Sequence, residues 1–236
     1  MVALPVQLIL PIKFHDTLTF QSFYPGQNRT LLNYLHSFIL KKAGCYLYLW
    51  GHRGVGCTHL LRASCHQAQL QGFTALYFSL AELIRLGTPA VLEDLDVHSL
   101  DFVCIDDLER IAQHRIWQDI LFHTYNRLQD YNVRLILVAK KVPHHLGLVL
   151  PDLVSRLSGG VLFQVQGLPD SEKISALKYY ARCKGLVLLD EVAQFLLLRL
   201  PREISVLFAA LDQLDNASLA LQRKLTIPFV KTILKL

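Results

Sequence analysis

A glycine-rich stretch near residue 50 carries the first spacing of residues that could do chemistry. The apolar run YLYLW (46–50) leads into Gly51, and Gly56, Cys57 and Thr58 follow after four further residues. This is the frame of a phosphate-binding loop, G-x-x-x-x-G-K-[ST], with Cys57 in the position of the lysine. In such a loop, backbone N–H groups and the N-terminus of the next helix hold anionic oxygens. Because the lysine is missing, we do not expect tight ATP binding.

Two interpretations of this stretch stay open. Gly51, Gly54 and Gly56 could simply form a tight turn between a strand and a helix. The flanking strand and helix favour a phosphate loop, as does Thr58, whose hydroxyl would hold Mg²⁺ in such a site. The candidate nucleotide-binding residues of the loop are therefore the three glycines, Cys57 and Thr58.

A second candidate site residue lies about 50 residues further along the chain. FVCIDD (102–107) is an apolar strand that ends in Asp106, which would ligate magnesium beside the loop. The next position usually carries a glutamate that polarises the attacking water. Asp107 is one methylene shorter, and near-attack geometry tolerates little displacement. A strand that ends in two aspartates is common, so Asp106 gains its weight from being paired with the loop.

The composition favours a folded globular protein over a disordered or membrane-spanning one. The 236 residues are 52% hydrophobic and 18% charged, which provides a sizeable core and argues against disorder. No run of about 18 uninterrupted apolar residues exists, and the apolar start carries Pro5 and Pro11 without a basic segment before it. We therefore expect neither a signal peptide nor a membrane partner. A net charge of +5 permits an acidic or nucleic-acid partner without demanding one.

The cysteines indicate a reducing compartment. They are Cys45, Cys57, Cys65, Cys104 and Cys183. Their number is odd and they form no C-x-x-C pair, which favours free thiols in the cytoplasm over disulfides. The cysteines and histidines between 57 and 66 have poor ligand spacing, so no metal site is expected there.

Alternating helical and strand-like segments predict an α/β fold. Strands are expected at 45–50, 74–80, 101–107, 133–139 and 161–165, and helices at 28–42, 58–71 and 114–131. This alternation predicts a parallel five-stranded sheet covered on both faces. From Leu168 onwards every segment is helical, beginning with Asp170 as candidate N-cap and a stop at Gly185. The expected units are an extended arm (1–18), an α/β nucleotide-binding domain (19–167) and a small all-helical domain (168–236).

The order of these motifs resembles the AAA+ ATPases of the bacterial replication-initiator group. It runs from the glycine loop through CIDD (104–107), RLILVAKKVP (134–143) and LPDLVSRL (150–157) to LPREISVLF (200–208) in a helical lid. TFQSFYPGQNRTLL (19–32) is similar to the stretch that opens the core of the initiator DnaA and contacts the nucleotide base. The sequence stops after the lid without a helix-turn-helix domain, and residues 212–236 resemble the end of the regulatory inactivators of DnaA.

The resemblance implies roles for two arginines. In this family the nucleotide lies between two subunits, and an arginine finger of one subunit reaches the γ-phosphate held by the other. Arg156 matches the finger, against the alternative of an ordinary surface arginine beside Asp152. Arg202 matches the second sensor, which contacts phosphate from the same chain, against the alternative of an arginine at a helix start.

The strand that ends near residue 139 departs from the family pattern. Lys140 stands where asparagine or aspartate is usual. It could supply the positive charge that Cys57 removed, or it could reflect drift in a site no longer used for hydrolysis. Cys57, Asp107 and Lys140 are thus altered in the chain's own site, whereas Arg156 is retained. We expect a poor ATPase whose finger acts on a partner, with ADP as a possible cofactor and Mg²⁺ only together with nucleotide.

The amino-terminal QLILPI resembles the peptide by which proteins dock on the bacterial sliding clamp. The residues concerned are Gln7, Leu8, Leu10, Pro11 and Ile12. The glutamine can hydrogen-bond while the apolar side chains fill a pocket, and an extended peptide suits this mode of recognition. A first strand packed on the domain would look similar in sequence. A clamp loaded on DNA would raise the effective concentration of this chain near the initiator.

The function that the resemblance implies is negative regulation of replication initiation. With the DNA-loaded clamp, the chain would stimulate hydrolysis of ATP bound to DnaA, contact DNA only through the clamp, and self-associate as a homodimer or larger assembly. Two rivals are a stand-alone ATPase of the same fold and a DNA-binding adaptor. A third makes Cys57 a redox switch, because a thiol at a helix N-terminus should have a lowered pKa, although burial could leave it inert.

Overall fold

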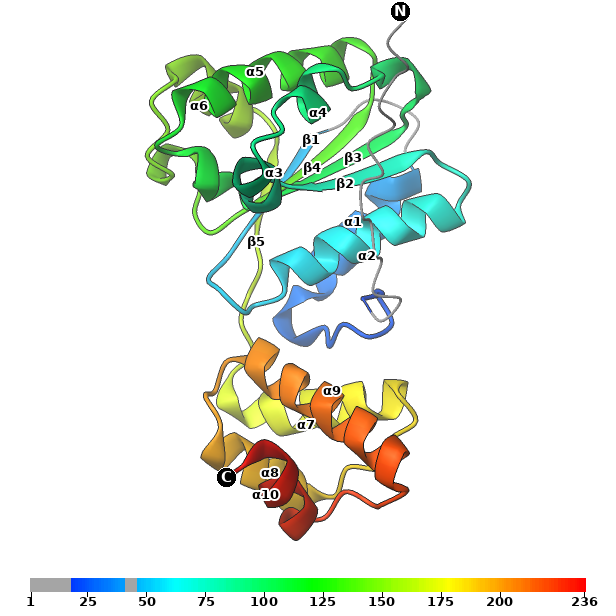
Figure 1. The fold of residues 1–236 in the computed structure, drawn as a ribbon. Helices are drawn as coiled ribbons and strands as arrows, with labels where there is room; N and C mark the ends of the chain where they lie inside the picture. Colours follow the sequence, from blue (N-terminus) through cyan, green and yellow to red (C-terminus); the bar gives the residue numbers. More distant parts are fainter. Residues whose placement is uncertain (1–17, 41–45) are drawn as a thin grey trace, which may run out of the picture.

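The structure, a computed structural model, describes residues 18–40 and 46–236. A parallel sheet carries helices on both faces, and a separate bundle of helices lies at one end of it (Figure 1). The strands are β1 (Tyr46–Trp50), β2 (Ala75–Ser79), β3 (Phe102–Asp106), β4 (Arg134–Ala139) and β5 (Val161–Gln164). Their order in the sheet is β2-β3-β4-β1-β5, which confirms the predicted five-stranded parallel α/β architecture.

Alternate residues of the inner strand β1 face two different cores. Leu47 and Leu49 pack with α1 (Arg29–Leu40) and α2 (Cys57–Leu70), whereas Tyr46 and Tyr48 face the opposite layer. That layer contains α5 (Arg115–Asp130) and α6 (Pro151–Ser158). Apolar burial on both faces is what a parallel sheet requires. The edge strand β5 is the exception, because its Val161 and Leu162 are exposed.

Short helices that the sequence did not predict follow β2. They are α3 (Leu80–Leu86) and α4 (Ala90–Glu93). Ser79, the last residue of β2, caps α3 by accepting a 3.3 Å hydrogen bond from the Glu82 N–H group. The predicted strand ran one residue too far, to Leu80, because an N-cap serine also suits the end of a strand. Single turns of 3-10 helix complete the connections: η1 (Gly26–Asn28), η2 (Val97–Ser99), η3 (Leu108–Ile111) and η4 (Pro143–His145).

The helices of the lid are α7 (Asp170–Cys183), α8 (Asp190–Arg199), α9 (Ile204–Leu221) and α10 (Ile227–Leu234). The expected boundary near residue 167 falls in the connection between β5 and α7. The prediction that Asp170 is an N-cap was wrong. Pro169 occupies the N-cap position, and Asp170 is the first residue of α7, where its carboxylate pairs with Lys173 and Arg202.

Helix α9 is long and apolar enough, by length and composition alone, to cross a membrane. In this structure Leu207, Leu211 and Leu214 of α9 are buried in the core of the lid. Its Asp212 and Asp215 lie near the ammonium group of Lys184, the C-cap residue that follows α7, at 2.7 and 3.9 Å. One face of α9 therefore packs into the lid, while the greater part of the helix is not buried in this structure.

The turn before η1 touches both parts of the molecule. On the sheet side, the carbonyl oxygen of Thr19 lies 2.8 Å from Nε2 of His59 in α2. On the lid side, the Tyr179 hydroxyl donates a 2.6 Å hydrogen bond to the carbonyl oxygen of Gln21, and Tyr24 packs edge-on against the Tyr179 ring. The turn therefore connects the start of α2 to the lid.

Candidate functional site

The glycine loop between β1 and α2 has the backbone of a phosphate-binding loop. Gly54 and Gly56 have φ values of 80° and 103°, in the left-handed region that favours glycine. A Cβ atom on Gly56 would lie 2.7 Å from Cε2 of Phe23, and one on Gly51 would lie 2.7 Å from Cγ2 of Val55. A side chain at Gly56 would therefore displace Phe23, and one at Gly51 would displace Val55.

Helix α2 starts one residue earlier than predicted, at Cys57. Its N-cap is Gly56, which has no side chain to satisfy the first N–H groups of the helix. Such unsatisfied donors, together with the helix dipole, favour an anion at this end. Thr58 is exposed at the same end, within reach of a ligand.

The thiol of Cys57 is buried and faces the interior of the α/β domain. Only 8% of the residue is exposed. Burial raises the pKa of Cys57 to about 12, and the nearby Asp106 carboxylate adds to the effect. The expectation of a lowered pKa was wrong, because desolvation outweighs the helix N-terminus at this position. The lysine position of the loop thus holds an uncharged side chain with little thiolate character.

Asp106 lies at the end of β3 and reaches the loop, as its pairing with the loop predicts. Its carboxylate accepts hydrogen bonds from the Tyr77 hydroxyl at 3.1 Å and the Asp107 N–H at 2.8 Å, and also from the Thr58 side chain. Burial and the neighbouring Asp107 charge raise the pKa of Asp106 to about 6. The hydroxyl and the carboxylate that would share a magnesium ion are therefore in contact.

The side chain of Asp107 is held toward β2. Its backbone is in the left-handed region, with φ at 62°, and its Oδ2 accepts a 2.8 Å hydrogen bond from the Ser79 hydroxyl. The same hydroxyl caps α3. The carboxylate that stands in the glutamate position is thus anchored to the neighbouring strand end.

Lys140 lies beside the loop, as the hypothesis of a replacement charge requires, but its charge is already matched. Its Nζ is 2.7 Å from Oε1 of Glu109 in η3. Both residues belong to the lining of the cleft that contains Cys57. In this conformation the lysine neutralises a carboxylate of the chain itself.

The loop, the ends of β3 and β4 and the lid enclose a cleft of about 660 Å³. From the α/β domain, its lining includes the whole predicted loop from Gly51 to Thr58, together with Asp106, Asp107 and Lys140. From the segment that precedes α1, Phe23, Tyr24 and Asn28 contribute. A volume of this size and a lining from two domains are typical of a ligand site.

The lid closes the cleft with α7 and α9. Tyr180 and Phe208 are stacked with ring centroids 4.2 Å apart, and both line the cleft. The Tyr180 hydroxyl donates a 3.0 Å hydrogen bond to Asp212, another lining residue. Near the loop, a Cβ atom on Gly54 would lie 3.1 Å from Oγ of Ser205. The start of α9 therefore lies directly against the loop.

The structure does not place Arg202, the candidate second sensor, among the residues that line the cleft. Its guanidinium is exposed, and Nη1 lies 2.5 Å from Oδ2 of Asp170 at the start of α7. Lys173 and Arg202 hold the pKa of Asp170 below its ordinary value. In this structure Arg202 therefore pairs with an exposed carboxylate of the lid instead of lining the cleft.

Arg156 lies on α6, in the layer opposite α1 and α2. Leu153 and Leu157 bury the inner side of this short helix, and Arg156 is exposed. Burial raises the pKa of Tyr125 in α5, an effect that the nearby Arg156 charge opposes. Within residues 18–40 and 46–236, Arg156 forms no ion pair and no side-chain hydrogen bond. Its guanidinium is therefore available to a partner.

The cleft fits a nucleotide with its phosphates at the loop, although the fit is incomplete. Glycines in the required conformation, an uncapped helix start and the contact between Thr58 and Asp106 all match such a ligand. The lysine is replaced by the buried Cys57, and the carboxylates of Asp106, Asp107 and Glu109 line the same space. Bound Mg²⁺ would offset part of that negative charge, with Thr58 and Asp106 as its protein ligands.

The predicted clamp-binding residues 7–12 lie outside the described residues.

Several other residues of the site were not predicted, because no sequence motif includes them. Tyr77 and Ser79, which hold the two aspartates, lie within an ordinary apolar strand, and Glu109 lies in a 3-10 turn. Their partners are distant in sequence, so only the folded chain brings them together.

Comparisons with known proteins agree with this geometry. A family model described as the bacterial DnaA ATPase domain matches residues 14–164, and one described as the lid domain of Hda matches residues 170–234. Domain III of the replication initiation protein DnaA from Thermotoga maritima is similar with a TM-score of 0.74 at 21% identity, covering 92% of this chain and 95% of that one.

A longer structure is similar as well. AMPPCP-bound DnaA from Aquifex aeolicus has a TM-score of 0.64 at 26% identity, and the match covers 79% of this chain and 62% of that one. The DnaA ATPase model alone spans more than half of the 236 residues, and the lid model accounts for the helical domain. The chain therefore belongs to the Hda/DnaA-related family of AAA+ proteins, a family of DNA replication regulators.

Proposed function

We propose that this chain stimulates hydrolysis of ATP bound to DnaA and so acts as a negative regulator of replication initiation. The observation that carries the proposal is the state of Arg156, which is exposed and unpaired within the described part of the chain. A guanidinium that reaches a partner's γ-phosphate stabilises charge in the transition state and is worth about 10³ to 10⁵ in rate. DnaA would perform the chemistry, and this chain would complete its site.

Features of the chain's own cleft support the inference that this chain hydrolyses ATP poorly by itself. The position of the loop lysine is occupied by a buried thiol, and the Asp107 carboxylate is bonded to Ser79. Both features weaken hydrolysis, because positioning and charge stabilisation account for most of phosphoryl-transfer catalysis. We infer that turnover by the isolated chain is negligible and that bound ADP, with Mg²⁺, would serve to order the protein.

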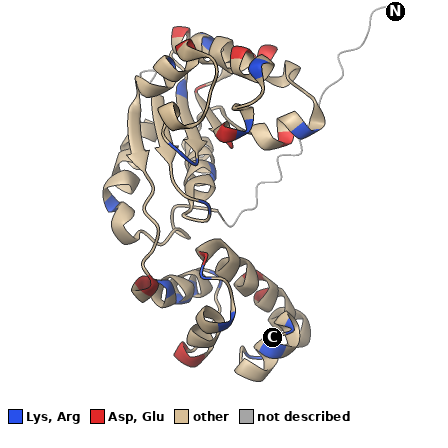
Figure 2. Cartoon of the chain, turned by 90° about the vertical axis from the view of Figure 1, so that its left-hand side faces the viewer, with Lys and Arg blue, Asp and Glu red and all other residues tan. Residues whose placement is uncertain are grey.

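Recruitment would come from the sliding clamp. Residues 7–12 have the clamp-peptide pattern, and their docking on DNA-loaded clamp would concentrate the chain near DnaA. Charges of both signs are scattered over the sheet domain and the lid in Figure 2, with no broad face of one sign in that view. This distribution favours indirect contact with DNA through the clamp. The described cysteines are free thiols, which suits a cytoplasmic setting.

The experiment is a reconstituted assay with DnaA–ATP, clamp loaded on DNA, and wild-type or Arg156→Ala protein. We expect Arg156→Ala to bind clamp normally and to lose nearly all stimulation of ATP hydrolysis. Arg115→Ala is the matched control, since Arg115 is also exposed and lies on the neighbouring helix α5. Full stimulation by Arg156→Ala would overturn the proposal.

A second arm of the same assay tests the rival enzyme. The chain is incubated with ATP alone, without DnaA or clamp. We expect no turnover above background. Steady hydrolysis that is lost in Asp106→Asn would identify a stand-alone ATPase, because Asp106 belongs to the chain's own cleft.

A further inference from the structure

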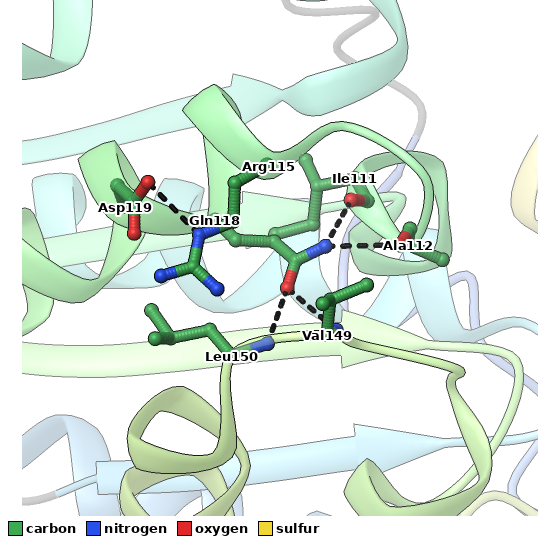
Figure 3. Close-up of polar contacts among 7 residues, drawn as sticks. All are labelled: Ile111, Ala112, Arg115, Gln118, Asp119, Val149 and Leu150. Carbon is green, nitrogen blue, oxygen red and sulfur yellow. Dashed lines mark hydrogen bonds and ion pairs between the residues drawn. The ribbon is translucent and has the colours of Figure 1, made fainter.

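A buried glutamine joins the helix that carries Arg156 to the segment that follows the cleft aspartates. Gln118, on α5, is fully buried. Figure 3 shows its amide between two backbone segments that come from different parts of the chain. No sequence motif includes this residue.

All hydrogen-bonding capacity of the Gln118 amide is used. Its Nε2 donates to the carbonyl oxygens of Ile111 and Ala112, both at 2.9 Å. Its Oε1 accepts from the N–H groups of Val149 at 2.9 Å and Leu150 at 3.0 Å. A fully satisfied buried amide of this kind holds its partners rigidly, because a displaced group would lose its hydrogen bond without gaining water.

The acceptor side of the amide fixes the start of α6. Leu150 is the N-cap of this helix and has no side chain that can cap it, and Pro151 follows at the first helical position. The Gln118 Oε1 instead holds the two residues that lead into the helix, Val149 and Leu150, through their N–H groups. Arg156 lies six residues beyond Leu150, which is about 9 Å along a helix axis. A change in the direction of α6 at its start would therefore move the guanidinium.

The donor side of the amide fixes the segment after β3. Ile111 is the last residue of η3, the turn that contains Glu109 and follows Asp106 and Asp107 directly. The same amide thus connects the chain's own cleft with the start of α6.

We propose that Gln118 is a positioning residue for the arginine finger, and that its amide sets the orientation of α6 so that Arg156 meets the partner's phosphate. This inference rests on the proposed function. A small change in the position of Arg156 would have a large effect, since a misplacement of about 1 Å in a catalytic group can cost about 100-fold in rate.

The test uses Gln118→Met in the reconstituted assay with DnaA–ATP and DNA-loaded clamp. Methionine has a similar size and removes all the hydrogen bonds of the amide. We expect the maximal stimulated rate to fall about 10- to 100-fold, while the concentration that gives half-maximal stimulation changes less than about threefold. Hydrogen exchange at the amides of Val149 and Leu150 should accelerate, and exchange in α2 should stay unchanged.

Two controls separate positioning from general loss of stability. Thr124→Val removes another buried hydrogen bond of α5, from the Thr124 hydroxyl to the carbonyl oxygen of Leu92 at 3.4 Å, which does not involve α6. Arg115→Ala breaks the exposed ion pair with Asp119 that is drawn beside Gln118 (Figure 3). Both variants should keep full stimulation even where Thr124→Val lowers the melting temperature.

A pH series with Gln118→Glu gives a second readout. An ionised glutamate can accept from Val149 and Leu150 but cannot donate to the carbonyl groups, whereas the neutral acid can donate to one of them. Burial raises the pKa of a carboxyl group, so the neutral form should gain as the pH falls. Stimulation relative to wild type is expected to rise as the pH is lowered from 8 to 6.5, in contrast to Gln118→Met.

The outcomes distinguish this inference from the proposed function. If Arg156→Ala abolishes stimulation while folded Gln118→Met retains it within about twofold, Gln118 does not position the finger. The positioning role is equally overturned if Thr124→Val at equal thermal stability loses as much activity as Gln118→Met. If Arg156→Ala itself retains full stimulation, the proposed function fails and the positioning role fails with it.

Discussion

The cleft beside the glycine loop and the outer side of α6 differ in whether they present an unpaired cationic side chain. In the cleft, the loop cation is replaced by the buried Cys57, and Lys140 is bound to Glu109. On α6, Arg156 is exposed and forms no ion pair with a described residue, while a buried amide holds the start of its helix. The two regions belong to one sheet domain, so the difference in their cationic side chains reflects the individual residues at each place and not the architecture of the domain.

The contrast teaches where this scaffold is specialised. The cleft keeps the features that shape a phosphate site, namely the glycines, the helix start and the contact of Thr58 with Asp106. The loop lysine is replaced by the buried Cys57, and the Asp107 carboxylate is hydrogen-bonded to Ser79. The α6 side keeps a free cation on a rigid support, which costs the chain a buried polar group that must be satisfied. Such a division suits a protein that binds nucleotide weakly and acts on a partner.

Replacement of Arg156 by lysine gives the sharpest test of the comparison. Lysine keeps the charge but lacks the planar fork that engages two phosphate oxygens. We expect Arg156→Lys to lose stimulation of DnaA-bound ATP hydrolysis by about 10³-fold, close to the loss in Arg156→Ala. Initial rates of phosphate release measure the effect. A lysine variant with wild-type rates would mean that α6 contributes only charge.

Thiol labelling tests the state of the cleft directly. Burial raises the pKa of Cys57 to about 12, so very little thiolate exists at pH 8. We expect iodoacetamide to modify Cys57 about 10³-fold more slowly than an ordinary exposed thiol, with Cys183 as the exposed control in the same chain. Peptide mass spectrometry follows both. Rapid labelling of Cys57 would indicate a reactive thiolate in the cleft and would support the redox interpretation.

Much of the sheet domain was predictable because its signals are local. Apolar runs of strand length, each followed by a helical pattern, located every strand to within two residues at each end. The glycine spacing located the loop, and the acid at the end of FVCIDD was correctly paired with it, since the carboxyl ends of parallel strands share one edge.

The remaining features depend on competition between distant groups. Arg202 was expected at phosphate but pairs with Asp170, a residue 32 positions earlier. The pKa of Cys57 depends on burial beneath the loop, which the sequence position at a helix start does not reveal. Gln118 belongs to a helix that was predicted well, yet its partners lie in two other segments. Each of these required the assembled chain.

The stability of the cleft should depend on pH through Asp106. Burial raises its folded-state pKa to about 6, above the ordinary value of 3.8, so the ionised carboxylate destabilises the folded state above pH 6. This cost disappears as the pH falls toward 4. We expect Asp106→Asn to raise the free energy of unfolding by up to about 3 kcal/mol at pH 8, and by less at pH 5.

Urea unfolding in magnesium-free buffer at the two pH values measures the Asp106 effect. Asp152→Asn, at an exposed position on α6, is the control and should show no such difference. A destabilising Asp106→Asn change at pH 8 would show that the hydrogen bonds from Tyr77 and Asp107 outweigh the cost of burial.

The smallest expected effect concerns Lys140. It tests whether this lysine replaces the missing loop cation or contributes little to nucleotide binding. Because Glu109 lies 2.7 Å from the lysine and half of the lysine side chain is exposed, we expect Lys140→Ala to change ADP affinity less than about threefold. Glu109→Gln should strengthen ADP binding slightly, and the gain should vanish in the double variant if the released lysine causes it. Calorimetric titration of the single and double variants measures this coupling. A tenfold loss in Lys140→Ala would instead show that Lys140 replaces the missing loop cation, and the difference between the cleft and α6 would narrow accordingly.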